Sequence, residues 1–109
     1  MFSGLVLTDH AKTAQLEVRD FMRNKGYFCR LEVFVNDRGD GKTGRIDIVC
    51  YKKNETIAIE VDRKTPRRKS IFKLENFKAT KKYVICRNNY IKGVLKWKHN
   101  QQLDLNNLL

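Results

Sequence analysis

The segment from Gly44 to Lys64 decides the fold, and it reads GRIDIVCYKKNETIAIEVDRK. Its β-branched and aromatic residues alternate with other types on both sides of Asn54-Glu55, which predicts two strands, 45–51 and 56–62, joined by a tight turn. Acidic residues are depleted in strands. The segment nevertheless holds carboxylates inside both strands: Asp47, Glu60 and Asp62.

The period-two geometry of a strand assigns the side chains of this segment to faces. The first strand is expected to have two faces: Ile46, Ile48 and Cys50 on one, and Asp47, Val49 and Tyr51 on the other. The second strand is expected to divide in the same way: Ile57, Ile59 and Val61 on one face, and Ala58, Glu60 and Asp62 on the other. If the strands pair antiparallel, Asp47 and Glu60 share a side within reach of one ion.

The rest of the chain predicts two helices and further strands around this hairpin. Thr8 or Asp9 caps a first helix to about residue 25, followed by a strand over 27–35. Thr65-Pro66 starts a second helix that runs to about residue 79, and 83–86 is a strand. Because a strand, helix, strand succession implies a right-handed crossover with parallel pairing, we expect an α/β fold with a mixed central sheet flanked by helices.

Length and charge limit the possible functions. At 109 residues the chain is expected to form one domain over 1–109, with a core at about 8–87 and a C-terminal extension over 88–109. In that extension, 90–97 is a strand or a short helix, and 99–109 is a helix that docks or dimerises. The formal net charge of +11 favours a polyanion, DNA or RNA, over a merely solvated basic surface. An anionic membrane is disfavoured because the charges do not gather on one amphipathic helix.

Cysteine usage and the first residues point to a reducing compartment. Cys29, Cys50 and Cys86 are odd in number and lie in apolar segments, so we expect buried, unpaired thiols. The N-terminal residues show no basic leader with an apolar core. The expected location is the cytoplasm.

Carboxylates on a basic chain predict metal-dependent phosphodiester chemistry. Hard cations such as Mg²⁺ or Mn²⁺ bind carboxylate oxygens, polarise a phosphate and lower the pKa of an attacking water. Two basic segments are candidates for contact with the DNA backbone: the glycine-rich loop with Arg38, Lys42 and Arg45, and the start of the second helix with Arg67, Arg68 and Lys69. Cations at a helix N-terminus oppose the helix dipole, which favours a bound phosphate there.

These residues resemble the PD-(D/E)XK nuclease superfamily. The similarity lies in the sequence Arg-Ile-Asp47, then Ile-Ala-Ile-Glu60-Val-Asp62, between a helix with an acidic residue and a crossover helix, and it covers roughly residues 10–87. It is greatest for small Holliday junction resolvases and VRR-type nucleases. The resemblance implies an αβββαβ restriction-endonuclease-like core, a Mg²⁺-dependent deoxyribonuclease and a homodimer. It also implies a metal site in which Asp47, Glu60 and the Val61 carbonyl are ligands, assisted by Asp62 and by Glu17 from the first helix.

One departure from the family motif concerns its lysine. Asp62 stands where that lysine is expected, so the sequence has Glu-Val-Asp. Lys64 has the same strand parity as Glu60 and is the preferred substitute, and Lys73 from the crossover helix is the other candidate.

Other interpretations remain open at this point. One alternative places the strand carboxylates on a solvated sheet face, where they pair with Arg45 and Arg63. The alternative for Glu17 is an ordinary exposed position on its helix. At the level of function, the alternatives are a nucleic-acid-binding module of the same fold that has lost catalysis, and an adaptor that uses its basic face for protein contacts.

Overall fold

The computed structural model describes residues 2, 4–87, 90–91 and 94–95. Its elements follow in the order α1 (Ala11–Asn24), β1 (Phe28–Val35), β2 (Gly44–Lys52), β3 (Glu55–Asp62), α2 (Arg68–Glu75), β4 (Lys81–Cys86), β5 (Tyr90–Ile91) and β6 (Val94–Leu95). β5 and β6 form a small antiparallel pair of their own. Residues 92–93 and 96–97 of the segment expected as a strand or short helix, and the helix expected over 99–109, lie outside the described residues.

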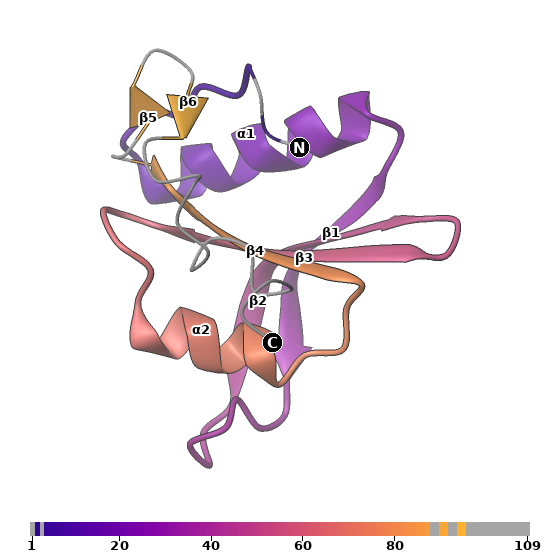
Figure 1. The fold of residues 1–109 in the computed structure, drawn as a ribbon, viewed down its shortest axis with the longest axis vertical. Coiled ribbons are helices and arrows are strands. Elements are labelled where there is room, and N and C mark those ends of the chain that lie inside the picture. The colour runs from indigo at the N-terminus through magenta and orange to yellow at the C-terminus, as the bar shows by residue number, and fades with distance from the viewer. Residues whose placement is uncertain (1, 3, 88–89, 92–93, 96–109) are drawn as a thin grey trace.

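The first four strands form a mixed sheet in the order β1-β2-β3-β4. β1 pairs with β2 and β2 with β3 in antiparallel fashion, while β3 and β4 are parallel and joined through α2. α1 covers one face of the sheet and α2 the other (Figure 1). The predicted α/β class, mixed sheet and parallel crossover are therefore confirmed.

β3 is buried on both faces, which separates two apolar cores. The core beneath α1 contains Ala14, Val18, Met22, Ile48, Ile57 and Ile59, and the core beneath α2 contains Ile46, Val49, Ala58, Leu74 and Val84. Each fully buried aliphatic side chain contributes roughly 1.5–3 kcal/mol of transfer free energy, so the two layers hold the helices against the sheet.

The helix ends differ from the expectation. α1 is capped by His10, whose Nδ1 accepts from the Thr13 amide at 3.4 Å. Thr8 does not cap the helix, because its amide and hydroxyl both donate to Glu17 Oε1 at 3.0 Å. α2 spans only Arg68–Glu75, so the prediction that Thr65-Pro66 starts it was wrong.

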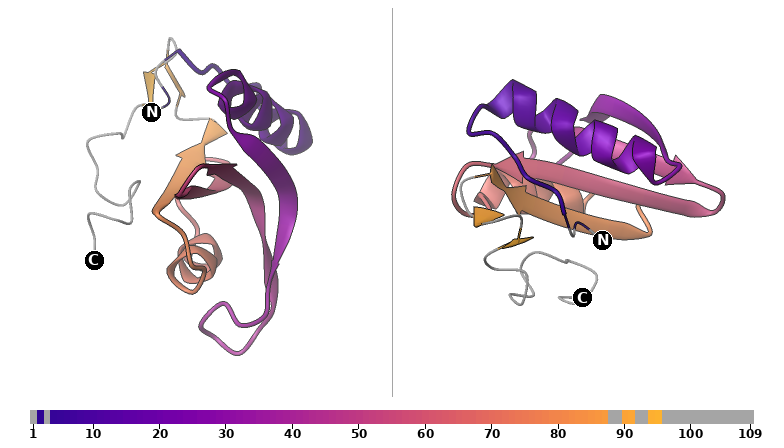
Figure 2. Two further views of the ribbon diagram at one scale, coloured as in Figure 1. Left: turned by 90° about the vertical axis from the view of Figure 1, so that its right-hand side faces the viewer. Right: turned by 90° about the horizontal axis from the view of Figure 1, so that it is seen from above.

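Both strands of the β1–β2 hairpin lose the regular alternation of their side chains between the two faces of the sheet at the same point. Leu31 and its partner Ile48 pack in the α1-side core, whereas Val33 and its partner Ile46 pack in the α2-side core. Between these pairs lies Glu32, whose φ of 54° is left-handed. The prediction that Ile46 shares a face with Ile48 was wrong because the strand does not keep its regular alternation here. Figure 2 shows the hairpin curving along its length, from α1 at one end toward α2 at the other.

Cys29, Cys50 and Cys86 are buried and form no disulfide, as predicted. In the described part of the chain, neither helix has the length and apolar character needed to cross a membrane.

Candidate functional site

The candidate site lies where β2 and β3 separate. Their backbone pairing ends at Ile48 and Ile59, one residue before Asp47 and Glu60. From there the two carboxylates replace the missing strand hydrogen bonds. Glu60 Oε2 accepts from the Asp47 amide at 2.8 Å, and Asp47 Oδ2 accepts from the Val61 amide at 2.8 Å. This reciprocal pair of bonds holds both carboxylates across the opening.

Lys73 of α2 supplies the counter-charge of Glu60. Its Nζ lies 2.5 Å from Glu60 Oε1 and donates to the Arg45 carbonyl at 2.9 Å. The fully buried Oε1 of Glu60 therefore has the Lys73 ammonium as its charge partner. Gly44 makes room for the lysine stem, because a Cβ there would lie 2.7 Å from Lys73 Cδ. Of the two lysines considered from sequence, the structure brings Lys73 to the carboxylates.

The pKa values of both carboxyl groups are raised. Burial, followed by the charge of Asp47, raises the pKa of Glu60 to about 7, although Lys73 opposes the rise. Burial also raises the pKa of Asp47; the Val61 amide and Lys73 act in the opposite direction, while Glu32 and Asp62 add to the rise. A cation placed between Asp47 and Glu60 would offset the repulsion between their charged forms.

From α1, Gln15 and not Glu17 contacts this centre. The buried Gln15 side chain donates from Nε2 to the Asp47 carbonyl at 2.8 Å. Glu17 is held by Thr8 and does not line the pocket beside Asp47.

Asp62 is bound to the start of α2. Its Oδ2 accepts from the Arg67 amide at 2.8 Å, and its Oδ1 accepts from Arg67 Nε and from Ser70 Oγ, both at 2.9 Å. These bonds start α2 at Arg68 instead of at Pro66, and they satisfy a carboxylate that is only 1% exposed. Both carboxylate oxygens of Asp62 are therefore engaged by Arg67 and Ser70, whereas the resemblance implied that Asp62 assists the metal site.

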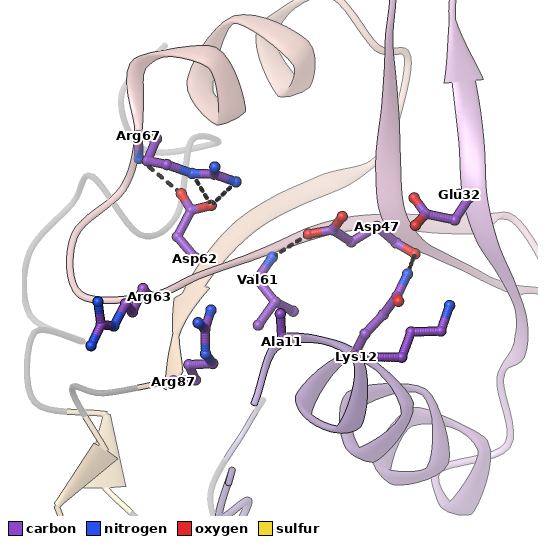
Figure 3. A pocket seen from close by; sticks show the side chains of 10 residues that line it. Ala11, Lys12, Glu32, Asp47, Val61, Asp62, Arg63, Arg67 and Arg87 are labelled. Atoms are coloured by element: carbon purple, nitrogen blue, oxygen red, sulfur yellow. Dashed lines mark hydrogen bonds and ion pairs between the residues drawn. The ribbon is translucent and has the colours of Figure 1, made fainter. Parts of the chain in front are cut away.

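A pocket of about 430 Å³ lies beside Asp47 (Figure 3). It is lined by Ala11, Lys12, Gln15, Glu32, Asp47, Val61, Asp62, Arg63, Arg67 and Arg87. The β1–β2 side of the pocket is acidic, with Glu32 and Asp47, while the side formed by the ends of β3 and β4 carries Arg63 and Arg87. Such a polarised pocket suits a metal cation next to an anionic substrate.

The predicted DNA-contacting residues fall into two groups. Arg38 is paired with Asp40 at 2.8 Å in the β1–β2 loop, where Lys42 and Arg45 are exposed. Arg68 and Lys69 are exposed at the start of α2, and of this set Arg67 alone lines the pocket. Lys64 is exposed between β3 and α2 and does not line it.

The donor set fits a hard divalent cation. Within the described residues, no three His, Cys, Asp or Glu side chains converge closely enough to enclose a metal. Mg²⁺ does not require such a cage, because it commonly binds through one or two carboxylates, water and substrate phosphate. Asp47 and Glu60 hold carboxylate oxygens across the opening of the two strands, and the Lys73 ammonium is the cation paired with Glu60 Oε1.

Gln15 and Glu32 were not among the site residues predicted from the sequence. Gln15 lies on the apolar stripe of its helix together with Ala14 and Val18, whereas Glu17 lies beside it, so helical spacing was an available signal. The position of Glu32 beside the site follows only from the register of the hairpin, which places it opposite Asp47.

Comparisons of the chain with protein-family models, with curated proteins and with solved structures find no match.

Proposed function

We propose that this protein is a Mg²⁺- or Mn²⁺-dependent endonuclease that hydrolyses DNA phosphodiester bonds, with preference for branched DNA. The observation that carries the proposal is the carboxylate pair of Asp47 and Glu60, fixed by reciprocal hydrogen bonds at the opening of β2 and β3 and neutralised by Lys73. The helix and strand order from α1 to β4 also supports the resemblance to PD-(D/E)XK nucleases.

Each residue of the site has a role in this proposal. Asp47, Glu60 and the Val61 carbonyl would hold the metal ion. When bound, the ion lowers the pKa of the attacking water and stabilises charge on the phosphate. Lys73 would take the place of the motif lysine. It neutralises the charge of Glu60 in the free protein and would offset the charge of the phosphate when DNA binds. Gln15 holds the Asp47 backbone in position through its carbonyl.

The basic residues would bind the DNA backbone. Lys12, Arg63 and Arg87 surround the pocket, and the predicted groups at the β1–β2 loop and the start of α2 extend the contact beyond it. Each phosphate contact releases counterions, so affinity should fall steeply with salt. A homodimer, which the family resemblance implies, would present two such sites to two strands.

The contact between Lys73 and Glu60 favours one alternative function. An ammonium group 2.5 Å from Glu60 Oε1 occupies space that a metal ion would need. A protein in which that ion pair is permanent would be a nucleic-acid-binding module without catalysis.

One experiment separates these functions. Purified protein is incubated with branched, duplex and single-stranded DNA, with EDTA, Mg²⁺ or Mn²⁺, beside Asp47→Asn, Glu60→Gln and the control Glu75→Gln, which changes an exposed carboxylate of α2. We expect metal-dependent cleavage that both site variants reduce by about 100-fold or more and the control leaves unchanged. Cleavage in EDTA, or full activity of Asp47→Asn, contradicts the proposal. Tight binding of branched DNA without cleavage in either metal supports the binding module.

A further inference from the structure

Cys29 and Cys50 lie directly opposite each other in the β1–β2 pair. Both side chains are buried in the α1-side core, and their Sγ atoms are 3.0 Å apart in a thiol–thiol hydrogen bond. Opposite residues of an antiparallel pair have Cα atoms about 4.5–5.5 Å apart, and disulfides join cysteines whose Cα atoms are about 4.4–6.8 Å apart. The two thiols therefore already stand where a cross-strand disulfide would form.

The two thiols differ in access and in their surroundings. Cys29 is 6% exposed and lies on β1, at the edge of the sheet, whereas Cys50 is fully buried on β2. Burial raises the pKa of Cys29, but the hydrogen bond with Cys50 and the charges of Arg23 and Arg19 oppose the rise. Burial and the neighbouring Cys29 thiol both raise the pKa of Cys50. Because the thiolate is the reactive form, Cys29 is the thiol that meets an oxidant first.

We propose that Cys29 and Cys50 form a redox site that hydrogen peroxide closes into a cross-strand disulfide. The Cys29 sulfur attacks one peroxide oxygen and the O–O bond breaks. Cys29 becomes a sulfenic acid, and the other oxygen leaves as water with the Cys29 proton. The Cys50 sulfur then attacks Cys29 Sγ, the S–O bond breaks, and the hydroxyl group leaves as a second water with the Cys50 proton. The two thiols lose two electrons and two protons, which reduce one peroxide to two water molecules.

The disulfide would fasten the edge strand to the rest of the sheet. β1 pairs with β2 alone among the described strands, and the bond would join positions that are 21 residues apart in the sequence. Closing such a loop restricts the unfolded chain, so the oxidised protein should resist unfolding better than the reduced one. Neither cysteine lines the pocket beside Asp47, so this role is separate from the proposed nuclease function.

The test is oxidation of the reduced, full-length protein with hydrogen peroxide, followed by alkylation of the remaining thiols and tryptic peptide mapping. Trypsin places the three cysteines in separate peptides, 26–30, 46–52 and 83–87. We expect one cross-link, between 26–30 and 46–52, while Cys86, which lies in the α2-side core, is recovered as an alkylated thiol. In urea, where the fold no longer sets the pairing, we expect a mixture of cross-links. A native product with that same mixture, or with no link between Cys29 and Cys50, overturns the proposal.

Urea unfolding measures the effect of the bond on stability. We expect the midpoint to rise by about 1 M or more on oxidation and to return to its starting value after treatment with dithiothreitol. Cys50→Ala should show no such rise and should leave Cys29 as a sulfenic acid that dimedone traps, whereas the matched control Cys86→Ala should still form the disulfide. A disulfide that leaves the midpoint unchanged, or lowers it, overturns the stabilising role. The peptide map of the parent tests the redox site even if a variant fails to fold.

Discussion

Replacing Lys73 by methionine tests the ion pair at the centre of the site. The variant keeps most of the side-chain volume but removes the ammonium group that faces Glu60 Oε1 at 2.5 Å. It also removes the hydrogen bond to the Arg45 carbonyl, a loss of about 1 kcal/mol that does not depend on pH. Glu60 is then left buried beside Asp47 without a counter-ion.

The size of the effect follows from proton linkage. In the parent, the pKa of Glu60 rises from 4.5 to about 7 on folding. The folded protein therefore binds more protons than the unfolded chain in this interval, and its stability falls by about 1.4 kcal/mol per pH unit before levelling off above pH 7. Without Lys73 the pKa of Glu60 rises further, so stability continues to fall. The difference between parent and variant should be about 1 kcal/mol at pH 5 and should widen above pH 7 by up to about 1.4 kcal/mol per pH unit.

Urea unfolding between pH 5 and 9, with EDTA present, measures this difference. Lys69→Met is the matched control, since it removes an exposed lysine from the same helix and should shift stability by less than about 0.5 kcal/mol at every pH. Adding Glu60→Gln to Lys73→Met should remove the extra pH dependence. A difference that is the same at pH 5 and pH 9 would refute the coupling between Lys73 and Glu60.

Three further predictions concern the neighbours of this pair. Asp62→Ala should destabilise the fold by about 2–3 kcal/mol in urea unfolding, because it removes the hydrogen bonds at the start of α2. The Mn²⁺ affinity measured by calorimetry should stay within about twofold, and a large loss of affinity would identify Asp62 as a ligand. Gln15→Leu should cost about 1–2 kcal/mol in the same unfolding assay and weaken Mn²⁺ binding about tenfold, because the Asp47 carbonyl loses its donor; unchanged binding would exclude a positioning role. Mn²⁺ affinity should weaken by up to about tenfold per unit as pH falls below 7, because the metal must displace the proton of Glu60, and titrations at pH 5.5 and 8 that agree would contradict this.

Local pattern was sufficient for the order and type of the main elements. The alternation on both sides of Asn54-Glu55 and the apolar stripe of α1 reflect the periods of strand and helix, which depend on neighbouring residues alone. The crossover through α2 followed from the handedness rule for parallel strands. Those signals predicted the α/β class and the mixed sheet.

Local pattern failed where contacts with residues outside a segment set its conformation. Asp62, at the end of β3, accepts from the Arg67 amide and the Ser70 hydroxyl, and the helix begins at Arg68 and not at the Thr-Pro signal. The alternation of β2 is broken at Asp47, because that residue and Glu32 occupy the position at which the hairpin changes faces. Neither effect is encoded in the spacing of either segment by itself.

The sequence by itself determined the two carboxylates at the centre of the candidate site, Asp47 and Glu60, because acidic residues inside apolar strands stand out in a strongly basic chain. Only the tertiary structure decided their partners. Lys73 and Gln15 reach them from opposite faces of the sheet, and Glu32 faces Asp47 through the register of the hairpin. The physical reason is that charge and hydrogen bonding act through space over a few ångströms, whereas sequence periodicity describes one element at a time.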